Sequence, residues 1–274
     1  MNKHCQTALQ HDGLEPTVDN SSIDLSQIKK YTCQNHTLIN GDCLDGMKNL
    51  SNESVDLFVT DPPYNLGRFM QGRNTGVFRM RKNHFVASGW DDLDYPEWDG
   101  KMRSFLSLAY RLLKNDGGII IFMSLMKIES LISAAQSVGF YYKTTGIWHK
   151  LNPIPRNMNL TFVNSTEGWV YFVKKGRSGT FNNDGKVIHD FFESGLTPAS
   201  EKKYGNHPTQ KPLKLIKHFV EVLSNPGDTI VDPFMGSGTT GVASAELGRN
   251  FFGIEYDANY FDVAVKRLEN CIPK

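Results

Sequence analysis

The stretch VDPFMGSGTTGVASAELGRNFFGIE, residues 231–255, decides the fold predicted for this chain. An apolar strand runs into a loop with Gly236 and Gly238, and a helix begins directly at Thr239. Backbone N–H groups and a helix N-terminus then point at whatever lies above the strand. A second strand ends in Glu255, from which a carboxylate can accept hydrogen bonds from two ribose hydroxyls. Strand, GxG loop, helix, strand and acid together predict a βαβ unit that binds a nucleoside cofactor.

Short apolar runs alternate with stretches of helical periodicity in the rest of the chain. We expect strands over residues 36–40, 55–60, 118–124, 141–150, 167–175, 228–234 and 250–255, and helices over 44–50, 102–118, 127–140, 212–227, 239–248 and 257–270. This alternation is typical of a mostly parallel sheet covered by helices on both faces. The pattern therefore predicts a doubly wound α/β fold.

The overall composition restricts the class of protein. The 274 residues include 30 Lys and Arg against 29 Asp and Glu, a net charge of +1 that excludes a globally basic nucleic-acid coat. A hydrophobic content of 39% indicates one large globular domain. No window approaches about 18 uninterrupted apolar residues, and the N-terminus lacks a signal-peptide core, so we expect no membrane partner and a cytoplasmic location. The four scattered cysteines lack metal-ligand spacing and predict no metal site.

Three segments depart from the regular pattern. Residues 1–30 are polar and are expected to form an N-terminal arm before the domain at 31–274. Residues 65–99 show no alternation, and residues 176–206 indicate a short Gly- and Asn-rich insertion. The segment 65–99 begins with five basic residues and ends with five acidic ones; the basic ones are Arg68, Arg73, Arg79, Arg81 and Lys82. Such a block is either a solvated loop whose halves pair with each other or an arm that lies on phosphates.

A second motif, Asp61-Pro62-Pro63-Tyr64, stops the predicted strand over 55–60. Ligands of open α/β sheets bind at the carboxyl ends of strands, where this motif lies. The prolines would hold the Asp61 carboxylate and a free carbonyl rigidly toward one point, and Tyr64 offers a flat face. Two acceptors and a stacking plane form a clamp for an exocyclic amino group on a planar base.

Four motifs together resemble those of a known family. They are DPPY at 61–64, HPTQKP at 207–212, DPFMGSGTT at 232–240 and GIE at 253–255. In order and spacing they resemble the AdoMet-dependent amino-methyltransferases of DNA, in the β-class group whose DPPY motif precedes the Gly-rich motif. The resemblance covers about residues 36–270. It implies a circularly permuted class I methyltransferase fold: a seven-stranded, mostly parallel sheet whose last strand is antiparallel, with a small recognition insertion at 176–206.

The resemblance also implies site residues. The catalytic residues would be Asp61, Pro62, Pro63 and Tyr64. S-adenosylmethionine (AdoMet) would be held at its adenine by Asp42, at its ribose by Glu255, and around its methionine end by Asp232, Phe234, Gly236, Ser237, Gly238 and Thr239. The HPTQKP turn, which by itself is also a plain helix start, would hold the methionine carboxylate through His207, Thr209, Gln210 and Lys211.

The implied reaction is methyl transfer to the exocyclic N6 of an adenine in double-stranded DNA. Asp61 and the Pro62 carbonyl would accept the two amine hydrogens while Tyr64 stacks on the base. This geometry requires the base to be flipped out of the duplex. Residues 65–99 would then be a DNA-contact loop whose basic half, Arg68 to Lys82, lies on phosphates, and Phe69, Phe78 and Trp90 are candidate wedges or pocket walls.

Several alternatives stay open at this point. N4-cytosine methylation uses the same clamp, although Ser is its more frequent mark at the position of Asp61. Methylation of RNA or of a protein amide uses Asn in that position, and the motif order stands against it. A catalytically inactive DNA-binding regulator has no physical reason to keep the clamp, and a nicotinamide dehydrogenase would need GxGxxG. The target sequence, a homodimer and a cognate restriction endonuclease are likewise left open.

Overall fold

A computed structural model describes residues 29–66, 90, 93–155, 159, 161–175 and 179–271. Within these residues one sheet contains β1 (Lys30–Cys33), β2 (His36–Asn40), β3 (Val55–Thr60), β4 (Leu113–Met123), β5 (Phe140–Lys150), β6 (Thr166–Lys174), β7 (Phe191–Ser194), β8 (Thr229–Asp232) and β9 (Asn250–Glu255). The helices are α1 (Cys43–Met47), α4 (Tyr95–Leu112), α5 (Ile128–Val138), α6 (Leu213–Leu223), α7 (Thr239–Glu246) and α8 (Ala258–Glu269), with short 3-10 turns at Leu125–Lys127 and Ala199–Lys202.

The strand order of the sheet is β1-β2-β9-β8-β3-β4-β6-β5-β7. From β2 to β4 all neighbours are parallel, and β6 runs antiparallel between β4 and β5. The seven strands from β2 to β5 therefore confirm the predicted doubly wound, mostly parallel sheet. The antiparallel strand is β6 and not the last strand of the chain, since β9 runs parallel to both of its neighbours. Two short strands that were not predicted extend it: β1 pairs with β2, and β7, inside the segment 176–206, pairs with β5.

The boundaries of one predicted helix were wrong. Helix α4 begins at Tyr95, where Asp94 and Glu97 form a capping box, and not at residue 102. It ends at Leu112, because the following residues extend the edge of β4, where Leu113 pairs with Val55 of β3. The Asn-Asp-Gly-Gly sequence that was expected to close the helix therefore belongs to a strand.

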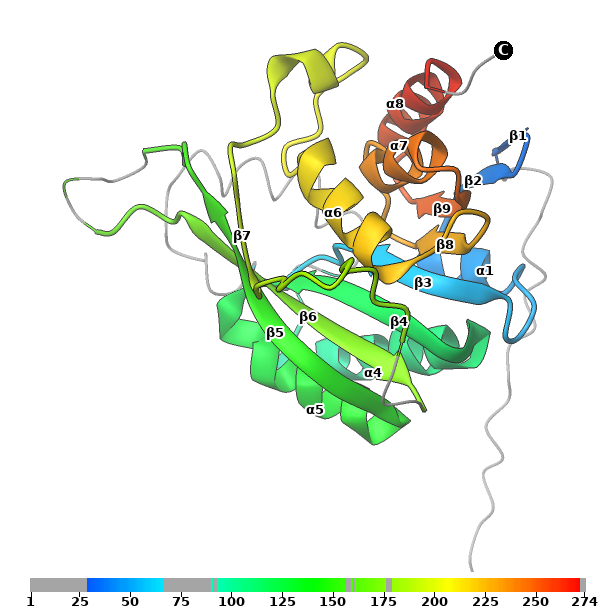
Figure 1. The fold of residues 1–274 in the computed structure, drawn as a ribbon, viewed down its shortest axis with the longest axis horizontal. Helices are drawn as coiled ribbons and strands as arrows, with labels where there is room; N and C mark the ends of the chain where they lie inside the picture. The colour runs from blue at the N-terminus through cyan, green and yellow to red at the C-terminus, as the bar shows by residue number, and fades with distance from the viewer. Residues whose placement is uncertain are drawn as a thin grey trace, which may run out of the picture.

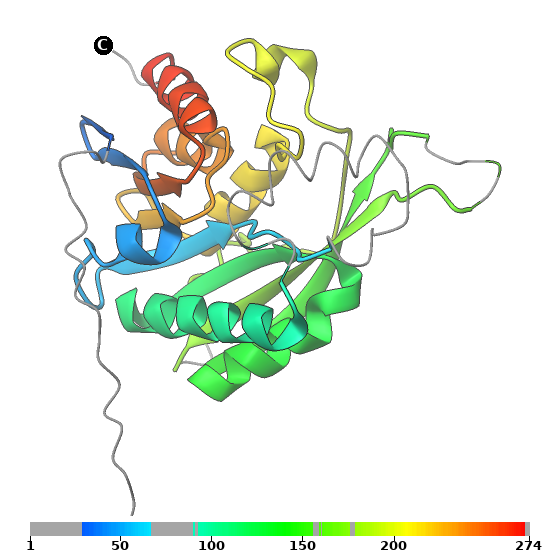
Figure 2. The same ribbon diagram turned by 180° about the vertical axis from the view of Figure 1, so that it is seen from behind.

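Helices cover both faces of the sheet (Figure 1). Helices α4 and α5 pack on one face, and α6, α7 and α8 cover the other. In Figure 2 the face with α4 and α5 is turned toward the viewer. Alternate residues of β4 serve the two cores: Ile119 and Ile121 face α4, whereas Ile120 and Phe122 face α6. In the described part of the chain, no helix is both long enough and apolar enough to cross a membrane.

The carboxyl ends of the parallel strands meet at one edge of the sheet. Strand β8 lies between β9 and β3, so the chain winds in opposite directions on the two sides of the β8–β3 boundary. In open α/β sheets such a switch point is where ligands bind. Strand β3 ends at Thr60, directly before Asp61, and β8 ends at Asp232. The fold thus brings the DPPY motif and the Gly-rich motif side by side.

The core on the α4 face allows a test of the packing. Leu106 of α4 is fully buried there, whereas the next residue, Ser107, is exposed. We expect Leu106→Ala to lower the free energy of unfolding by about 2–5 kcal/mol, since it removes buried carbon and leaves a cavity. Ser107→Ala is the control and should stay within about 0.5 kcal/mol of the wild type in urea unfolding. Equal effects of the two substitutions would contradict the described packing.

Candidate active site at the carboxyl edge of the sheet

The turn after β3 is anchored at both of its ends. Pro62 is buried, and Asn65, with a φ of 51°, exchanges two hydrogen bonds with the backbone of Leu93. These bonds, of 3.1 and 2.9 Å, join the beginning of the segment 65–99 to the start of α4. The turn is therefore tied to the start of α4, and Asp61 lies at a defined place beyond the strand.

The Gly-rich loop after β8 depends on two backbone conformations that favour glycine. Gly236 has a φ of 53° and Gly238 a φ of 77°, and Gly238 is the residue from which α7 starts. Arg267 of α8, which is buried, donates to the Ser237 carbonyl, the Ser237 hydroxyl and the Thr239 hydroxyl at 2.8–3.0 Å. This guanidinium fixes the loop from behind.

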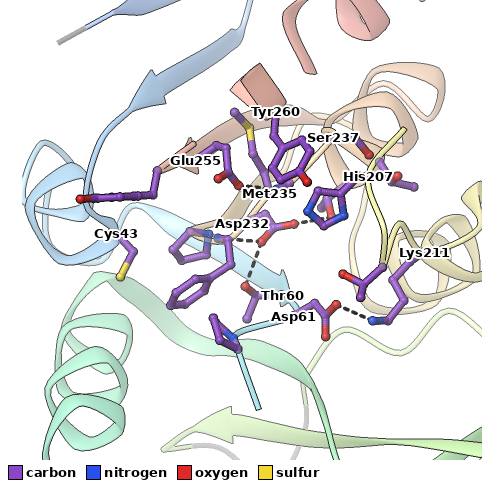
Figure 3. Close-up of a pocket in the computed structure, with 18 of the residues that line it drawn as sticks. Cys43, Thr60, Asp61, His207, Lys211, Asp232, Met235, Ser237, Glu255 and Tyr260 are labelled. Atoms are coloured by element: carbon purple, nitrogen blue, oxygen red, sulfur yellow. Dashed lines mark hydrogen bonds and ion pairs between the residues drawn. The ribbon is translucent and has the colours of Figure 1, made fainter. Parts of the chain in front are cut away.

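Asp232 connects this loop to the catalytic turn (Figure 3). Its carboxylate accepts hydrogen bonds from the Thr60 hydroxyl at 2.9 Å, the Thr240 hydroxyl at 2.7 Å and the Phe234 N–H at 3.1 Å. Burial raises the pKa of Asp232 to about 6, despite these donors. The residue therefore orders both motifs, in addition to lining the pocket between them.

Glu255 closes the other side of the loop. Oε2 accepts from the Gly236 N–H at 2.9 Å and Oε1 from the Asp257 N–H at 2.7 Å. Burial raises the pKa of Glu255 to about 7, since only neutral backbone donors contact it. Next to it across the sheet edge, Asp42 caps α1 by accepting from the Leu44 N–H at 2.8 Å.

A single pocket collects the residues that the sequence indicated. Those of the predicted residues that line it are Asp42, Asp61, Pro63, His207, Thr209, Gln210, Lys211, Asp232, Phe234, Gly236, Ser237, Thr239 and Glu255. Trp90, a candidate pocket wall, also lines it and packs edge-on against Phe234 at 5.3 Å between ring centroids. Pro62, Tyr64 and Gly238 are not part of its lining. Each of them is the direct neighbour in the chain of a residue that lines the pocket. The predicted DNA contacts, Arg68, Arg73, Arg79, Arg81 and Lys82, fall outside the described residues, as do Phe69 and Phe78.

The HPTQKP turn contributes a further part of the pocket wall. The His207 ring packs against Tyr260 at 4.3 Å between centroids, and Gln210 accepts a hydrogen bond from the Ser237 hydroxyl at 2.9 Å. Lys211 takes a different direction from its neighbours: its Nζ contacts Asp61 Oδ2 and lies 2.6 Å from Glu167 Oε1. Its amine is therefore on the side of the catalytic turn.

Sequence reasoning missed two members of this ionic cluster, Glu167 at the start of β6 and Lys150 at the end of β5. Lys150 Nζ is 2.9 Å from Glu167 Oε2, and the Tyr64 hydroxyl lies 2.5 Å from Glu167 Oε1. Burial alone would raise the pKa of Glu167, but Lys211 and Lys150 lower it to about 2. Burial raises the pKa of Asp61, against the opposing effect of Lys211. The one signal in the sequence for Glu167 was its place as the first residue of the strand predicted over 167–175.

Comparison with known proteins identifies the family. A family model described as DNA methylase matches residues 55–266. The chain belongs to this DNA methylase family. It is 34% identical to the type II methyltransferase M.HinfI of Haemophilus influenzae over 254 residues, which cover 87% of this chain and 69% of that protein. It is also 34% identical to the type II methyltransferase M2.DpnII of Streptococcus pneumoniae over 250 residues, covering 87% of this chain and 91% of that protein.

Solved structures agree with this assignment. The M1.HpyAVI–SAM complex has a TM-score of 0.63 at 29% identity and covers 85% of this chain and 99% of its own. The PvuII DNA methyltransferase, which is cytosine-N4-specific, has a TM-score of 0.70 at 20% identity over 86% of this chain and 87% of its own, a likeness of fold alone. The protein is therefore an AdoMet-dependent DNA methyltransferase with the class I fold.

The pocket of this DNA methylase fits AdoMet on its own chemistry. Two acids, the buried Asp232 and the half-buried Glu255, line it without an ion-pair partner among the described residues, as suits a cofactor with a sulfonium and an ammonium group. Phe234, Trp90 and Pro233 add apolar walls for a flat adenine. The glycine loop lets the backbone come close to the ligand.

Gly238 offers a test of the loop. A Cβ at Gly238 would lie 2.8 Å from the Ala264 Cβ, whereas a Cβ at Gly248, with a similar φ of 71°, would meet nothing within 4 Å. Both alanine variants share the left-handed backbone strain of about 1–2 kcal/mol. Only Gly238→Ala should also displace the loop and weaken AdoMet binding, by about tenfold or more in calorimetry. Equal AdoMet affinity of the two variants would show that the loop does not hold the cofactor.

Proposed function

We propose that this DNA methyltransferase transfers the methyl group to the exocyclic N6 of an adenine flipped out of duplex DNA. The observation that carries the proposal is the position of Asp61, which the Thr60–Asp232 hydrogen bond of 2.9 Å places next to the cofactor loop. Asp at the first position of the motif favours adenine, since Ser is the more frequent mark of cytosine enzymes. An amino group presented between the turn and the loop would face both.

The residues of the turn supply what an aromatic amine needs in order to react. The lone pair of such an amine is delocalised into the ring, and acceptors for both N–H groups favour a pyramidal, nucleophilic nitrogen. Asp61 and the Pro62 carbonyl are the proposed acceptors, and Tyr64 is the proposed stacking partner, held by its hydroxyl 2.6 Å from Asp61. When bound, AdoMet supplies a methyl group whose bond to sulfur breaks with both electrons remaining on sulfur.

The cofactor-side residues have proposed roles that follow from their positions. Glu255 would receive the ribose hydroxyls, and Asp42 the adenine. The Gly236–Thr239 loop and the turn with His207, Thr209 and Gln210 would surround the methionine end. Lys211 belongs to the same turn by sequence, and its contact with Asp61 supports a role nearer to the target base.

The DNA partner requires contacts beyond the pocket. Flipping a base costs a few kcal/mol, which phosphate and orphan-base contacts must offset. We assign this task to the basic half of 65–99, and target recognition to 176–206, which contributes strand β7 to the sheet edge. A homodimer, a cognate restriction endonuclease, as suggested by the type II names of the relatives, and a cytoplasmic location complete the proposal.

The proposed reaction can be tested by identifying the labelled base. Unmethylated DNA is incubated with tritiated AdoMet, digested to nucleosides and separated. We expect label in N6-methyladenine, and we expect Asp61→Ala to lower the rate by about 100-fold or more while AdoMet binding is kept. Asp262→Ala, at an exposed ion pair with Lys29, is the matched control. Label in N4-methylcytosine would refute adenine as the target, and no label in DNA would refute the proposal as a whole.

The role of Glu255 predicts a pH dependence of cofactor binding. Its pKa is raised to about 7, so the carboxylate ionises as the pH rises through neutrality. The ionised form accepts the stronger hydrogen bonds from ribose hydroxyls. AdoMet affinity should therefore increase between about pH 6 and pH 8 in the wild type, and this increase should be clearly smaller in Glu255→Gln, where only Asp232 with its pKa of about 6 still titrates, measured by calorimetry in matched buffers. The same pH dependence in both proteins would exclude Glu255 as its source.

A further inference from the structure

The hydroxyl of Tyr64 lies between two acidic side chains. Its oxygen is 2.6 Å from Asp61 Oδ1 and 2.5 Å from Glu167 Oε1. A phenol carries one proton and can donate it to one carboxylate at a time. Asp61 and Glu167 therefore compete for this one proton. The shared contact with Tyr64 couples the ionisation of the two carboxyl groups.

Lys211 contacts the same two carboxyl groups from another direction. Figure 3 shows its contact with Asp61. Its side chain is only 8% exposed, and the ammonium lies over the Phe122 ring at 5.1 Å, so water screens its charge little. Glu167 has Lys150 as a second cation at 2.9 Å, whereas Asp61 shares Lys211 with Glu167. The ionised form of Glu167 is therefore stabilised more than that of Asp61, so Asp61 binds a proton more strongly than Glu167 does.

We propose that Glu167 and Lys211 are positioning residues that set, in opposite directions, how strongly Asp61 binds a proton, so that Asp61 takes the proton which the target amine loses. The proposal rests on the proposed function, in which Asp61 accepts a hydrogen bond from that amine. Glu167, a like charge across Tyr64, strengthens proton binding by Asp61. Lys211, an opposite charge in contact with it, weakens proton binding.

The proton balance of the reaction calls for such an acceptor. When the amine nitrogen shares its lone pair with the methyl carbon, it becomes positively charged while it still carries both hydrogens. One N–H bond then breaks, its electron pair returns to nitrogen, and the proton moves to an oxygen of Asp61. The neutral methylamino group and a protonated Asp61 result, and solvent removes the proton before the next turnover. An ordinary exposed carboxyl binds a proton too weakly for this task at neutral pH.

The surroundings of the two acids agree with these directions. Burial raises the pKa of Asp61, Lys211 acts against it, and Glu167 raises it further. The pKa of Glu167 is lowered to about 2, since its two lysines outweigh burial. Asp61 is also close to Asp232, another acid, on the side of β8. Two carboxyl groups whose environments separate their proton affinities are the usual mark of an acid–base assignment.

The test is the pH profile of a single turnover. Enzyme in excess is mixed with unmethylated plasmid DNA and tritiated AdoMet, and the rate of label transfer is followed against pH. The rate should fall at low pH, where Asp61 becomes protonated. Glu167→Gln should move the half-maximal pH downward by about one unit and Lys211→Met should move it upward by about one unit. The double variant should return toward the wild type.

Matched controls separate this effect from a general loss of structure. Lys217→Met, on α6, and Glu246→Gln, at its ion-pair partner 3.1 Å away on α7, should leave the half-maximal pH unchanged. AdoMet binding reports folding; if one variant fails to fold, the shift of the other decides. Unchanged profiles, or shifts in one common direction, would overturn the inference. If the wild type does not label an exocyclic amine, the proposed function itself fails, which the nucleoside analysis detects independently.

Discussion

One buried carboxylate, that of Asp232, joins the two halves of the active site. Its hydrogen bonds to the Thr60 and Thr240 hydroxyls connect the end of β3 to the start of α7, although Thr60 and Asp232 are 172 positions apart in the chain. Because Thr60 precedes Asp61 directly, the same bond sets where the catalytic turn lies relative to the cofactor loop. The parallel pairing of β3 with β8 brings the two ends together, and the carboxylate then fixes their relative position. Two further contacts hold the ends that Asp232 does not contact. Arg267 binds the Ser237 carbonyl of the cofactor loop, and Asn65 binds the Leu93 carbonyl before α4.

The acidic side chains on the cofactor side have hydrogen-bond donors as partners, whereas those beside the catalytic turn have lysines. On the cofactor side, Asp232 and Glu255 receive only neutral donors, and burial raises the pKa values of both. A positively charged cofactor is the partner that such acids favour. On the side of the catalytic turn, Asp61 and Glu167 share Lys211, and Glu167 also pairs with Lys150, so that two cations balance two acids within the protein. A neutral adenine can enter there without adding an unpaired charge. The distribution of charge, and not its total of +1, is thus what matches the reaction.

Local signals in the sequence were sufficient for most of the elements, whereas most of the residues that line the pocket were expected from the family resemblance. Strands β2, β3 and β9 have the predicted bounds, because short apolar runs bordered by Gly, Pro or Asp define them locally. The edge strands β1 and β7 were not foreseen, since strands of four residues form through pairing with a neighbour and carry little signal of their own. Glu167 and Lys150 were missed for a related reason: they reach the site only because β6 inserts antiparallel between β4 and β5. The orientation of the Lys211 side chain depends on its ion pairs with Asp61 and Glu167 in the folded protein, and the HPTQKP motif does not specify these partners.

The central claim is that Asp61, held by the Thr60–Asp232 bond, receives the amino group of a flipped adenine. The most direct measurement is a crystal structure of the enzyme with S-adenosylhomocysteine and a DNA duplex that carries the enzyme's recognition sequence without the methyl group. We expect an extrahelical adenine whose N6 lies within about 3 Å of an Asp61 oxygen and of the Pro62 carbonyl oxygen. A target base that stays stacked in the duplex, or an extrahelical base whose amino group is held by other residues while Asp61 keeps only its contacts with Lys211 and Tyr64, would contradict this claim.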